Sequence, residues 1–340
     1  MRDLIVAGGG PVGLASALYA VRAGLDVGVV EPREGVIDKA CGEGLMPGAV
    51  TALAELGVDP DGHPIDGIRY VESDQVAEAP FRHGYGRGVR RTTLHGALEE
   101  AVAKAGIVID HHAVRAVEDR GDHVLVDGEP TRYLIAADGL HSPIRRLLGL
   151  DDPLARHRRY GLRTHVQVAP WTSFVEVHWS RMGEAYVTPV ADDLIGVAVL
   201  SDARRPFDDL LASFPALASR VASAPTTRVR GAGPLRQRAR RRVAGRVLLV
   251  GDAGGYVDAL TGEGIALGLA QARAAVAAVQ AGHPQRYELG ARRLGWRHEL
   301  LTRGLLTATR HPALRSRVVP AAASLPRVFS AAVNQLARPA

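Results

Sequence analysis

The chain has 340 residues, of which 46% are hydrophobic and 23% charged, and its formal net charge is +6. This composition is typical of a soluble globular protein long enough for one large or two modest domains. Only Lys39 and Lys104 of the 42 basic residues are lysines, and no nucleic-acid-binding motif accompanies the arginines, so we expect no nucleic-acid partner. The single cysteine, Cys41, excludes an internal disulfide.

The first predicted elements form a β-turn-α-β unit. Residues 4–7 are an apolar strand, residues 8–13 a glycine-rich turn and residues 14–23 a helix with Gly24 as its C-terminal cap, before a second strand over 27–30. This order within one short segment is typical of a nucleotide-binding fold.

The pattern then changes twice along the chain. The elements predicted next are a Gly- and Pro-rich segment over 32–47, helices over 49–56 and 90–105, and alternating runs at 113–117, 123–126 and 133–137. From 161 to 200 the alternation is that of antiparallel strands, which indicates a separate sheet inserted into the nucleotide-binding fold. A buried strand over 247–250 and a small-residue helix over 264–281 follow.

The turn GGGPVG carries the first chemical motif, G-x-G-x-x-G. Its first glycine permits the tight turn, its second lets the backbone approach a pyrophosphate, and its third lets helix and strand pack closely. Glu31 ends the second strand, where a carboxylate can accept hydrogen bonds from ribose hydroxyls. The unit predicts a dinucleotide site at Gly8, Gly10, Pro11, Val12, Gly13, Glu31, Pro32 and Arg33.

Two further motifs follow in order. In YLIAADGLHSPIRRLLG, Asp138 and Gly139 end an apolar strand; in GRVLLVGDAGGYVDALTGEGIALGLAQA, a buried strand runs into Asp252, and Gly262 precedes a helix. With all three motifs, the chain resembles the FAD-dependent oxidoreductase superfamily of aromatic-ring hydroxylases and geranylgeranyl reductases. Residues 1–150 and 245–285 carry the resemblance.

The resemblance implies an α/β fold, with a Rossmann-like FAD-binding domain of the glutathione-reductase type and an inserted antiparallel β-sheet that binds the substrate. We expect an FAD-binding domain over 1–65, 86–155 and 245–300, a substrate sheet over 66–85 and 156–244, and a C-terminal helical tail over 301–340.

The resemblance also assigns cofactor contacts. It adds Cys41, Arg91, Asp138, Gly139, Asp252, Gly262, Gly264 and Ile265 to the predicted FAD site. Asp252 would bond the ribityl chain, and a helix N-terminus near flavin N1 would stabilise the reduced cofactor by ~0.3–2 kcal/mol. The simpler alternatives are a local cap for Asp252, an ordinary turn for Asp138 and a surface charge for Arg91.

The motifs leave the reaction open between two branches. The first motif, GGGPVGL, resembles that of the hydroxylases. Two other segments, DALTGEGI and DKACGEGLMPGA, resemble the geranylgeranyl reductases. In addition, the positions at which hydroxylases carry His and Pro are occupied here by Gly255 and Ala259. We expect an NAD(P)H- and O₂-dependent hydroxylase of a lipophilic aromatic or polyketide-derived molecule. The alternative is a geranylgeranyl-reductase-like, FAD-dependent reductase of isoprenoid C=C bonds.

Neither reaction requires a side-chain catalyst, and the sequence shows no metal-ligand cluster. The candidates to line the flavin or substrate are Cys41, Arg163, His178, Trp179, Tyr186 and Pro189. Cys41 has three open roles: a small buried apolar residue, a residue lining the pocket, or a redox thiol. Glu43 is interpreted as a structural hydrogen-bonding residue rather than an acid catalyst.

We expect a cytoplasmic protein with a lipophilic small-molecule substrate, because the chain begins with a strand pattern and has no charge-free apolar run of ~18 residues. A weak membrane association stays open, through the arginine-rich run 236–246 or the tail after Arg310. The oligomeric state is not determined.

Overall fold

The computed structural model describes residues 1–152 and 158–338. Its larger sheet has the strand order β18–β19–β11–β1–β2–β8, and the four pairs from β19 to β8 are parallel. The strands are β1 (Arg2–Ala7), β2 (Val27–Val30), β8 (Ile109–Asp110), β11 (Glu129–Ala136), β18 (Val243–Ala244) and β19 (Val247–Leu249). Strands β9 (Val117–Asp119) and β10 (Val124–Val126) extend β11 on one side, with antiparallel pairing.

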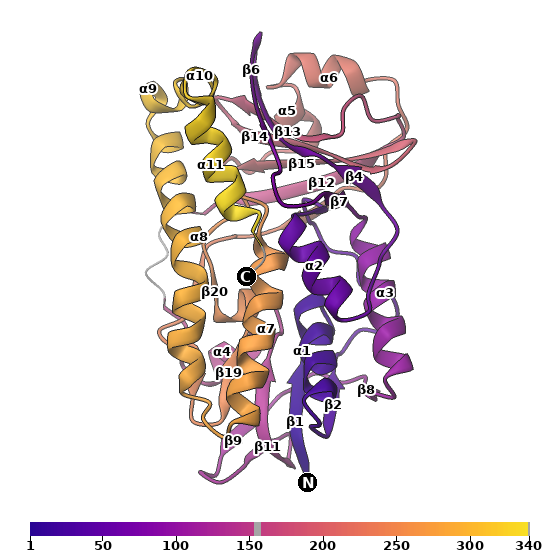
Figure 1. The fold of residues 1–340 in the computed structure, drawn as a ribbon, viewed down its shortest axis with the longest axis vertical. Coiled ribbons are helices and arrows are strands. Elements are labelled where there is room, and N and C mark those ends of the chain that lie inside the picture. Colours follow the sequence, from indigo (N-terminus) through magenta and orange to yellow (C-terminus); the bar gives the residue numbers. More distant parts are fainter. Residues whose placement is uncertain (153–157, 339–340) are drawn as a thin grey trace.

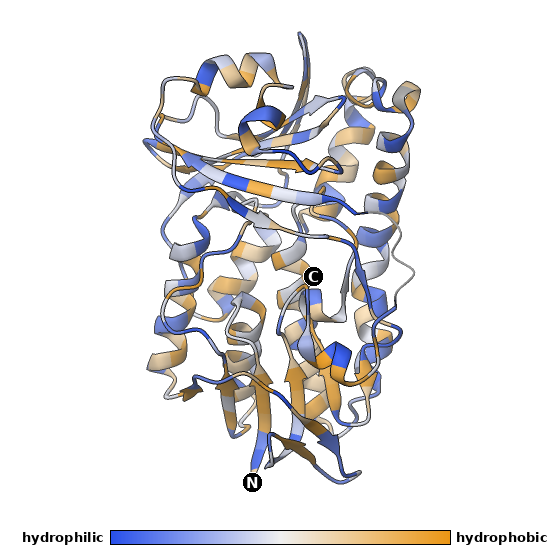
Figure 2. Ribbon diagram, turned by 180° about the vertical axis from the view of Figure 1, so that it is seen from behind, coloured by the Kyte–Doolittle hydropathy of each residue, from blue (hydrophilic) through white to orange (hydrophobic). Residues whose placement is uncertain are grey.

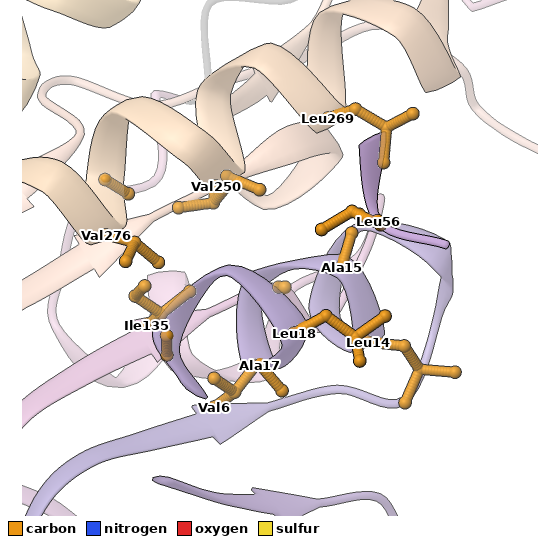
Figure 3. Close-up of a cluster of buried hydrophobic side chains, with 14 of the residues drawn as sticks. Val6, Leu14, Ala15, Ala17, Leu18, Leu56, Ile135, Val250, Leu269 and Val276 are labelled. Carbon is orange, nitrogen blue, oxygen red and sulfur yellow. The ribbon is translucent and has the colours of Figure 1, made fainter. Parts of the chain in front are cut away.

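Helices pack on one face of this sheet and bury its main core. They are α1 (Pro11–Arg22), α2 (Pro47–Glu55), α3 (Arg91–Lys104) and α7 (Gly264–Gln280). Figure 3 shows Leu14, Ala17 and Leu18 of α1 in this core, with Ala17 next to Val6 of β1, and Leu269 and Val276 on the neighbouring α7. A second apolar cluster, which includes Ile144 and Leu150, covers the other face of the sheet. The strands are mainly hydrophobic (Figure 2), as expected of parallel strands that are covered on both faces.

A second sheet lies across the far end of the molecule (Figure 1). Its order is β16–β12–β15–β14–β13–β5–β6. The strands are β5 (Gly67–Glu72), β6 (Gln75–Pro80), β12 (Tyr160–Val166), β13 (Phe174–Ser180), β14 (Gly183–Ala191), β15 (Leu194–Ser201) and β16 (Arg230–Ala232). The inserted sheet is confirmed, with one difference: β5 and β13 are parallel, because a hairpin from an earlier part of the chain adds to its edge.

Different helices cover the two faces of the second sheet. Helices α5 (Phe207–Leu211) and α6 (Pro215–Val221) pack on the outer face. The inner face packs against the C-terminal helices, which are α8 (Arg286–Arg310), α9 (Pro312–Arg315), α10 (Val318–Ser324) and α11 (Pro326–Leu336). Among the described residues, no helix combines the length and the hydropathy needed to cross a bilayer.

Short elements join the two sheets. Strands β3 (Gly44–Leu45), β4 (His63–Ile65) and β7 (Gly86–Gly88) form one small sheet, and β17 (Gln237–Arg238) pairs with β20 (Gly255–Tyr256). Helix α4 (Pro143–Leu147) and the 3₁₀ helix η1 (Gly251–Gly254) follow the ends of β11 and β19. The strand expected over 113–117 is wrong except at Val117, because residues 113–116 form a loop that Asp127 holds through the amides of Arg115 and Ala116.

A carboxylate on the outer face of the second sheet predicts how stability depends on pH. Burial alone would raise the pKa of Glu176, but bonds from His178, Trp171 and Arg69 outweigh it and lower the pKa to about 2. A lowered carboxylate pKa stabilises the fold above the unfolded value of 4.5, and this stabilisation is lost as pH falls towards 2.

We therefore expect Glu176→Gln to reduce the free energy of unfolding at pH 7 by roughly 3 kcal/mol, and the gap from wild type to narrow below about pH 4. Denaturant unfolding across this range measures the gap. The control is Glu78→Gln, which removes an exposed partner of Arg69. A gap that stays constant down to pH 2 would contradict the assignment.

Candidate functional site

Of the three motif glycines in the turn between β1 and α1, two are required by close packing and one faces open space. A Cβ atom on Gly8, whose φ is +111°, would lie 2.4 Å from the carbonyl oxygen of Ala137, and one on Gly13 would lie 1.8 Å from the carbonyl oxygen of Gly8. On Gly10 it would meet only Nη2 of Arg91, at 3.9 Å. The first N–H groups of α1 have no intrahelical partner here, so the open space suits an anionic group.

Pro11 and Val12 complete this turn. Pro11 occupies the first turn of α1, where its missing N–H costs nothing. Val12 packs so closely on α7 that a Cβ atom on Gly268 would lie 2.4 Å from its Cγ2, and one on Gly251 would lie 3.1 Å from its Cγ1. The first and third sequence motifs therefore meet at Val12.

Arg91 lies at the start of α3 with its guanidinium beside Gly10. Its side chain is buried, and Nη1 has no hydrogen-bond partner among the described residues. Burial lowers the pKa of Arg91. Buried charges in proteins are normally paired, so an unpaired guanidinium beside open space points to an absent anion, and Arg91 is not a surface charge.

Glu31 is buried at the end of β2 and is already fully paired. Its carboxylate accepts bonds from the amide of Gly9 at 2.7 Å and from Nε of Arg33 at 2.7 Å. Burial alone would raise the pKa of Glu31, but these bonds outweigh it and the pKa is lowered. A ribose at Glu31 would have to share the carboxylate with Arg33 or displace it, beside the exposed Pro32.

Arg145 joins the second motif to the third. Its side chain is almost fully buried, and Nη1 donates to the carbonyl oxygen of Ala253 at 3.0 Å. Nη2 donates to the carbonyl oxygen of Leu140 at 3.1 Å and to Oε1 of Gln237 at 3.2 Å. One guanidinium thus fixes loops that are more than 100 residues apart in the chain.

Two carboxylates, Asp138 and Asp252, lie at the ends of β11 and β19 close to the glycine turn, and the region that these residues share with the turn and Arg91 is called the predicted FAD groove. Burial raises the pKa of Asp252, against Lys39, Arg91 and Arg145, and burial also raises the pKa of Asp138. Asp138 caps α4 by accepting from the amide of Ile144 at 3.0 Å, yet its Oδ1 is buried with no partner among the described residues. A Cβ atom on the neighbouring Gly139 would lie 3.5 Å from Nζ of Lys39, so the amine also faces the groove.

The N-terminus of α7 supplies the last part of the groove. Gly262 has a φ of +69°, Gly264 begins the helix beside Tyr256, and Ile265 is half-buried against the main core. The carboxylate of Glu263 is anchored to α8, with Oε2 2.6 Å from Nδ1 of His298. The C-terminal helices thereby hold this turn in place.

Glu43 ties the segment before β3 to helix α3 and to the second sheet. This buried residue has a φ of +61°, and its carboxylate accepts from the amide of Arg91 at 2.9 Å. Nε2 of His165, on the inner face of the second sheet, lies 2.8 Å from the other oxygen. Arg163 beside it pairs with Asp38. These contacts give Glu43 a structural role.

The predicted substrate contacts do not all share one face. Tyr186 and Trp179 belong to the apolar cluster on the inner face, and the Tyr186 hydroxyl donates to the carbonyl oxygen of Leu260 at 2.8 Å. His178 bonds Glu176 on the outer face instead, because neighbouring residues of a strand point in opposite directions. Pro189 is buried, with its carbonyl oxygen against Gly88.

Cys41 lies half-buried in the segment that Glu43 anchors. The amide of Glu43 lies 3.4 Å from its Sγ, and burial raises the pKa of the thiol. A raised thiol pKa disfavours the reactive thiolate, which argues against the redox role and leaves the pocket-lining and packing roles.

Sequence reasoning missed two supporting residues. His95 places Nε2 2.7 Å from the carbonyl oxygen of Gly9, and Gln271 accepts from the amide of Gly251 at 2.9 Å. Both are polar side chains on otherwise apolar helix faces, which was the available signal. Among the described residues, no cluster of three or more His, Cys, Asp and Glu side chains could hold a metal ion.

Residues 1–189 match the family model described as an FAD binding domain. The chain belongs to this FAD-binding family. It is 32% identical to a menaquinone reductase of Mycobacterium tuberculosis, over 80% of the chain and 75% of that protein. It is 28% identical to digeranylgeranylglycerophospholipid reductase 1 of Methanothermobacter thermautotrophicus, over 86% of the chain and 80% of that protein.

The same fold occurs in p-nitrophenol 4-monooxygenase from Pseudomonas putida, which superposes with a TM-score of 0.82 at 20% identity, over 99% of this chain and 96% of that one. The groove fits FAD in three respects: open space at Gly10, an unpaired cation at Arg91, and unpaired oxygen at Asp138. This flavoprotein is therefore an FAD-dependent oxidoreductase.

Replacing Arg91 with Met tests whether its guanidinium holds the FAD diphosphate. We expect FAD to bind about 10- to 100-fold more weakly, because a charge-assisted bond is worth about 1.5–3 kcal/mol. We also expect the apoprotein to be as stable as wild type or more so, because a buried unpaired charge is removed. Flavin titration and apoprotein melting measure the two effects; unchanged flavin affinity would exclude the contact.

Proposed function

We propose that this flavoprotein reduces a C=C bond in the isoprenoid part of a lipid-like substrate. The observation that carries the proposal is the cluster of apolar side chains next to the predicted flavin end of the groove. Met46 and Leu260 flank Gly262 and belong to the same cluster as Tyr186 and Trp179 of the second sheet. Apolar side chains beside the flavin suit a hydrocarbon chain, because such a chain has no group that could form a hydrogen bond.

The two relatives support the same choice. Both are named as reductases, one of menaquinone and one of a digeranylgeranylglycerophospholipid, and each matches most of this chain. The monooxygenase shares the fold at an identity that carries no inference about reaction. This reverses the order of preference that GGGPVGL suggested.

The chain's own residues would act by binding and orientation. The N-terminus of α1 and Arg91 would hold the diphosphate, Asp252 would bond the ribityl chain, and the N-terminus of α7 would face the flavin pyrimidine. FAD supplies the hydride chemistry when bound. Glu43 would hold Arg91 in a fixed position relative to the inner face of the second sheet, because its carboxylate bonds both the Arg91 amide and His165. We propose NAD(P)H as the electron donor.

The test is an anaerobic reaction of the reduced holoprotein with menaquinone and with a geranylgeranyl lipid. Reduction by dithionite makes the result independent of the natural donor. Dithionite also reduces a quinone ring to the quinol, which adds two hydrogen atoms, so the products are reoxidised in air before mass spectrometry. We expect them to remain heavier by two hydrogen atoms, located in the isoprenoid chain. Product that forms only with oxygen present, and that carries ¹⁸O from ¹⁸O₂, would identify a hydroxylase and overturn the proposal.

A further inference from the structure

The net charge of the protein is confined to its C-terminal end. Residues 300–340 contain six arginines and no lysine, aspartate or glutamate, so they carry the whole net charge of +6. Residues 1–299 contain 36 basic and 36 acidic residues and are neutral overall. Such an imbalance in one segment is a feature of surfaces that meet an anionic partner.

Helix α8 leads into this segment and exposes an apolar stripe. Leu289, Trp296 and Leu300 are 59%, 54% and 62% exposed. At about 100° per residue, these positions lie within about 40° of one another around the helix. The buried residues Tyr287 and His298 lie on the opposite side. The stripe therefore faces directly away from the core.

Arginines border the stripe on both sides. Those exposed on α8 are Arg286, Arg292, Arg293, Arg297, Arg303 and Arg310. The only carboxylates of α8 are Glu288 and Glu299, which are half-buried and pair with Arg292 and Arg303. The outer face of α8 thus combines exposed apolar side chains with a net positive charge.

We propose that the outer face of α8 binds the surface of an anionic phospholipid bilayer. Helix α8 would lie in the plane of the headgroups, with the apolar stripe inserted and the arginines at phosphate level. Tryptophan is favoured at this depth because its ring is apolar and its N–H is polar. In the C-terminal segment that follows, Leu314, Leu325 and Val328 are also exposed and would extend the contact.

A lipid surface fits better than a protein partner. The stripe spans 12 residues, or about 17 Å, and is one side chain wide. Three side chains in a line cannot bury the ~800 Å² per partner of a stable protein interface, but each can insert between headgroups. Figure 1 shows α8 along one long edge of the molecule, where it is open to such a surface.

This surface would also connect the bilayer to the apolar inner face. Leu306, on the buried side of α8, belongs to the same cluster as Tyr186 and Trp179. A lipid-like substrate would then pass from the bilayer to the second sheet along the C-terminal helices. This consequence rests on the proposed function, whereas the binding itself does not.

The test is co-sedimentation of the FAD-loaded protein with vesicles of equimolar phosphatidylglycerol and phosphatidylcholine, and with phosphatidylcholine alone. We expect binding to the anionic vesicles that weakens with salt. Joint replacement of Leu289, Trp296 and Leu300 by Ser should weaken it about 100-fold. Arg293→Gln and Arg297→Gln should each weaken it roughly fivefold.

The control replaces three exposed apolar residues elsewhere, Tyr85, Val108 and Val229, by Ser and should bind as wild type. Flavin content and melting temperature verify that each variant is folded. Trp296→Phe should keep binding but remove the quenching of tryptophan fluorescence by brominated lipid, because Trp179 is buried and the half-buried Trp171 lies on the outer face of the second sheet, opposite the C-terminal helices.

No binding to anionic vesicles at low salt, or wild-type binding by the triple variant, would overturn the proposal. So would light scattering that shows the stripe to be a dimer contact. The vesicle assay needs no substrate, so a negative result would not contradict the proposed reductase activity. In the same way, a failure to reduce the test substrates would not contradict the proposed membrane-binding surface.

Discussion

Gly10→Asp should abolish FAD binding without unfolding the protein. Gly10 caps α1 with φ −75° and ψ 174°, a conformation that any residue adopts, and a Cβ atom there meets nothing closer than 3.9 Å. Aspartate is a favoured helix cap, so the apoprotein should be at least as stable as wild type. Its carboxylate would occupy the space for the FAD diphosphate, where like charges cost several kcal/mol, so affinity should fall about 100-fold or more.

Flavin titration and apoprotein melting separate this effect from misfolding. Gly96→Asp is the matched control, because Gly96 lies within α3 with nothing within 4 Å of its Cβ position. Gly13→Ala is the opposite case, since its Cβ would overlap the carbonyl oxygen of Gly8 and should destabilise the apoprotein itself. If Gly10→Asp retains FAD, the diphosphate does not lie at this turn.

Glu43→Ala should have the largest effect on stability. The side chain is buried and bonds the amide of Arg91 and Nε2 of His165, with Nε of Arg163 3.8 Å away. Its removal leaves these buried donors without their acceptor, which typically costs about 3–5 kcal/mol. FAD affinity should fall as well, because Arg91 loses its anchor.

Chemical denaturation measures the loss of unfolding free energy, and two further variants show which contacts cause it. Glu43→Gln keeps one acceptor for the Arg91 amide and should lose less. A double-mutant cycle with His165→Gln should be non-additive, since the side chains are in direct contact. Glu34→Ala, an exposed change in the same segment, is the control. A loss of unfolding free energy for Glu43→Ala within about 1 kcal/mol would show that Glu43 does not hold α3 to the second sheet.

Local sequence motifs are sufficient to predict the FAD-binding fold and those parts of the groove that depend on the local backbone. Gly8 is required by its backbone, whose φ is +111°, and Gly13 by its contact with the carbonyl oxygen of Gly8 in the same turn. Helix and strand periodicity follows from which face of each element is buried. These constraints act between near neighbours in the chain, so they are visible as motifs. The inserted sheet was visible for the same reason, as period-two alternation.

The contacts between side chains that are distant in the chain can be seen only in the folded structure. Arg145 bonds Ala253, Glu43 bonds His165, and Leu306 reaches the inner face of the second sheet through contacts between separate parts of the chain. Such contacts have no fixed spacing and leave no periodic trace, so the face that His178 occupies and the parallel edge strand β5 could not be predicted. Long-range packing sets them, because each residue's partner is chosen by how the sheets and helices fit together rather than by its neighbours in sequence.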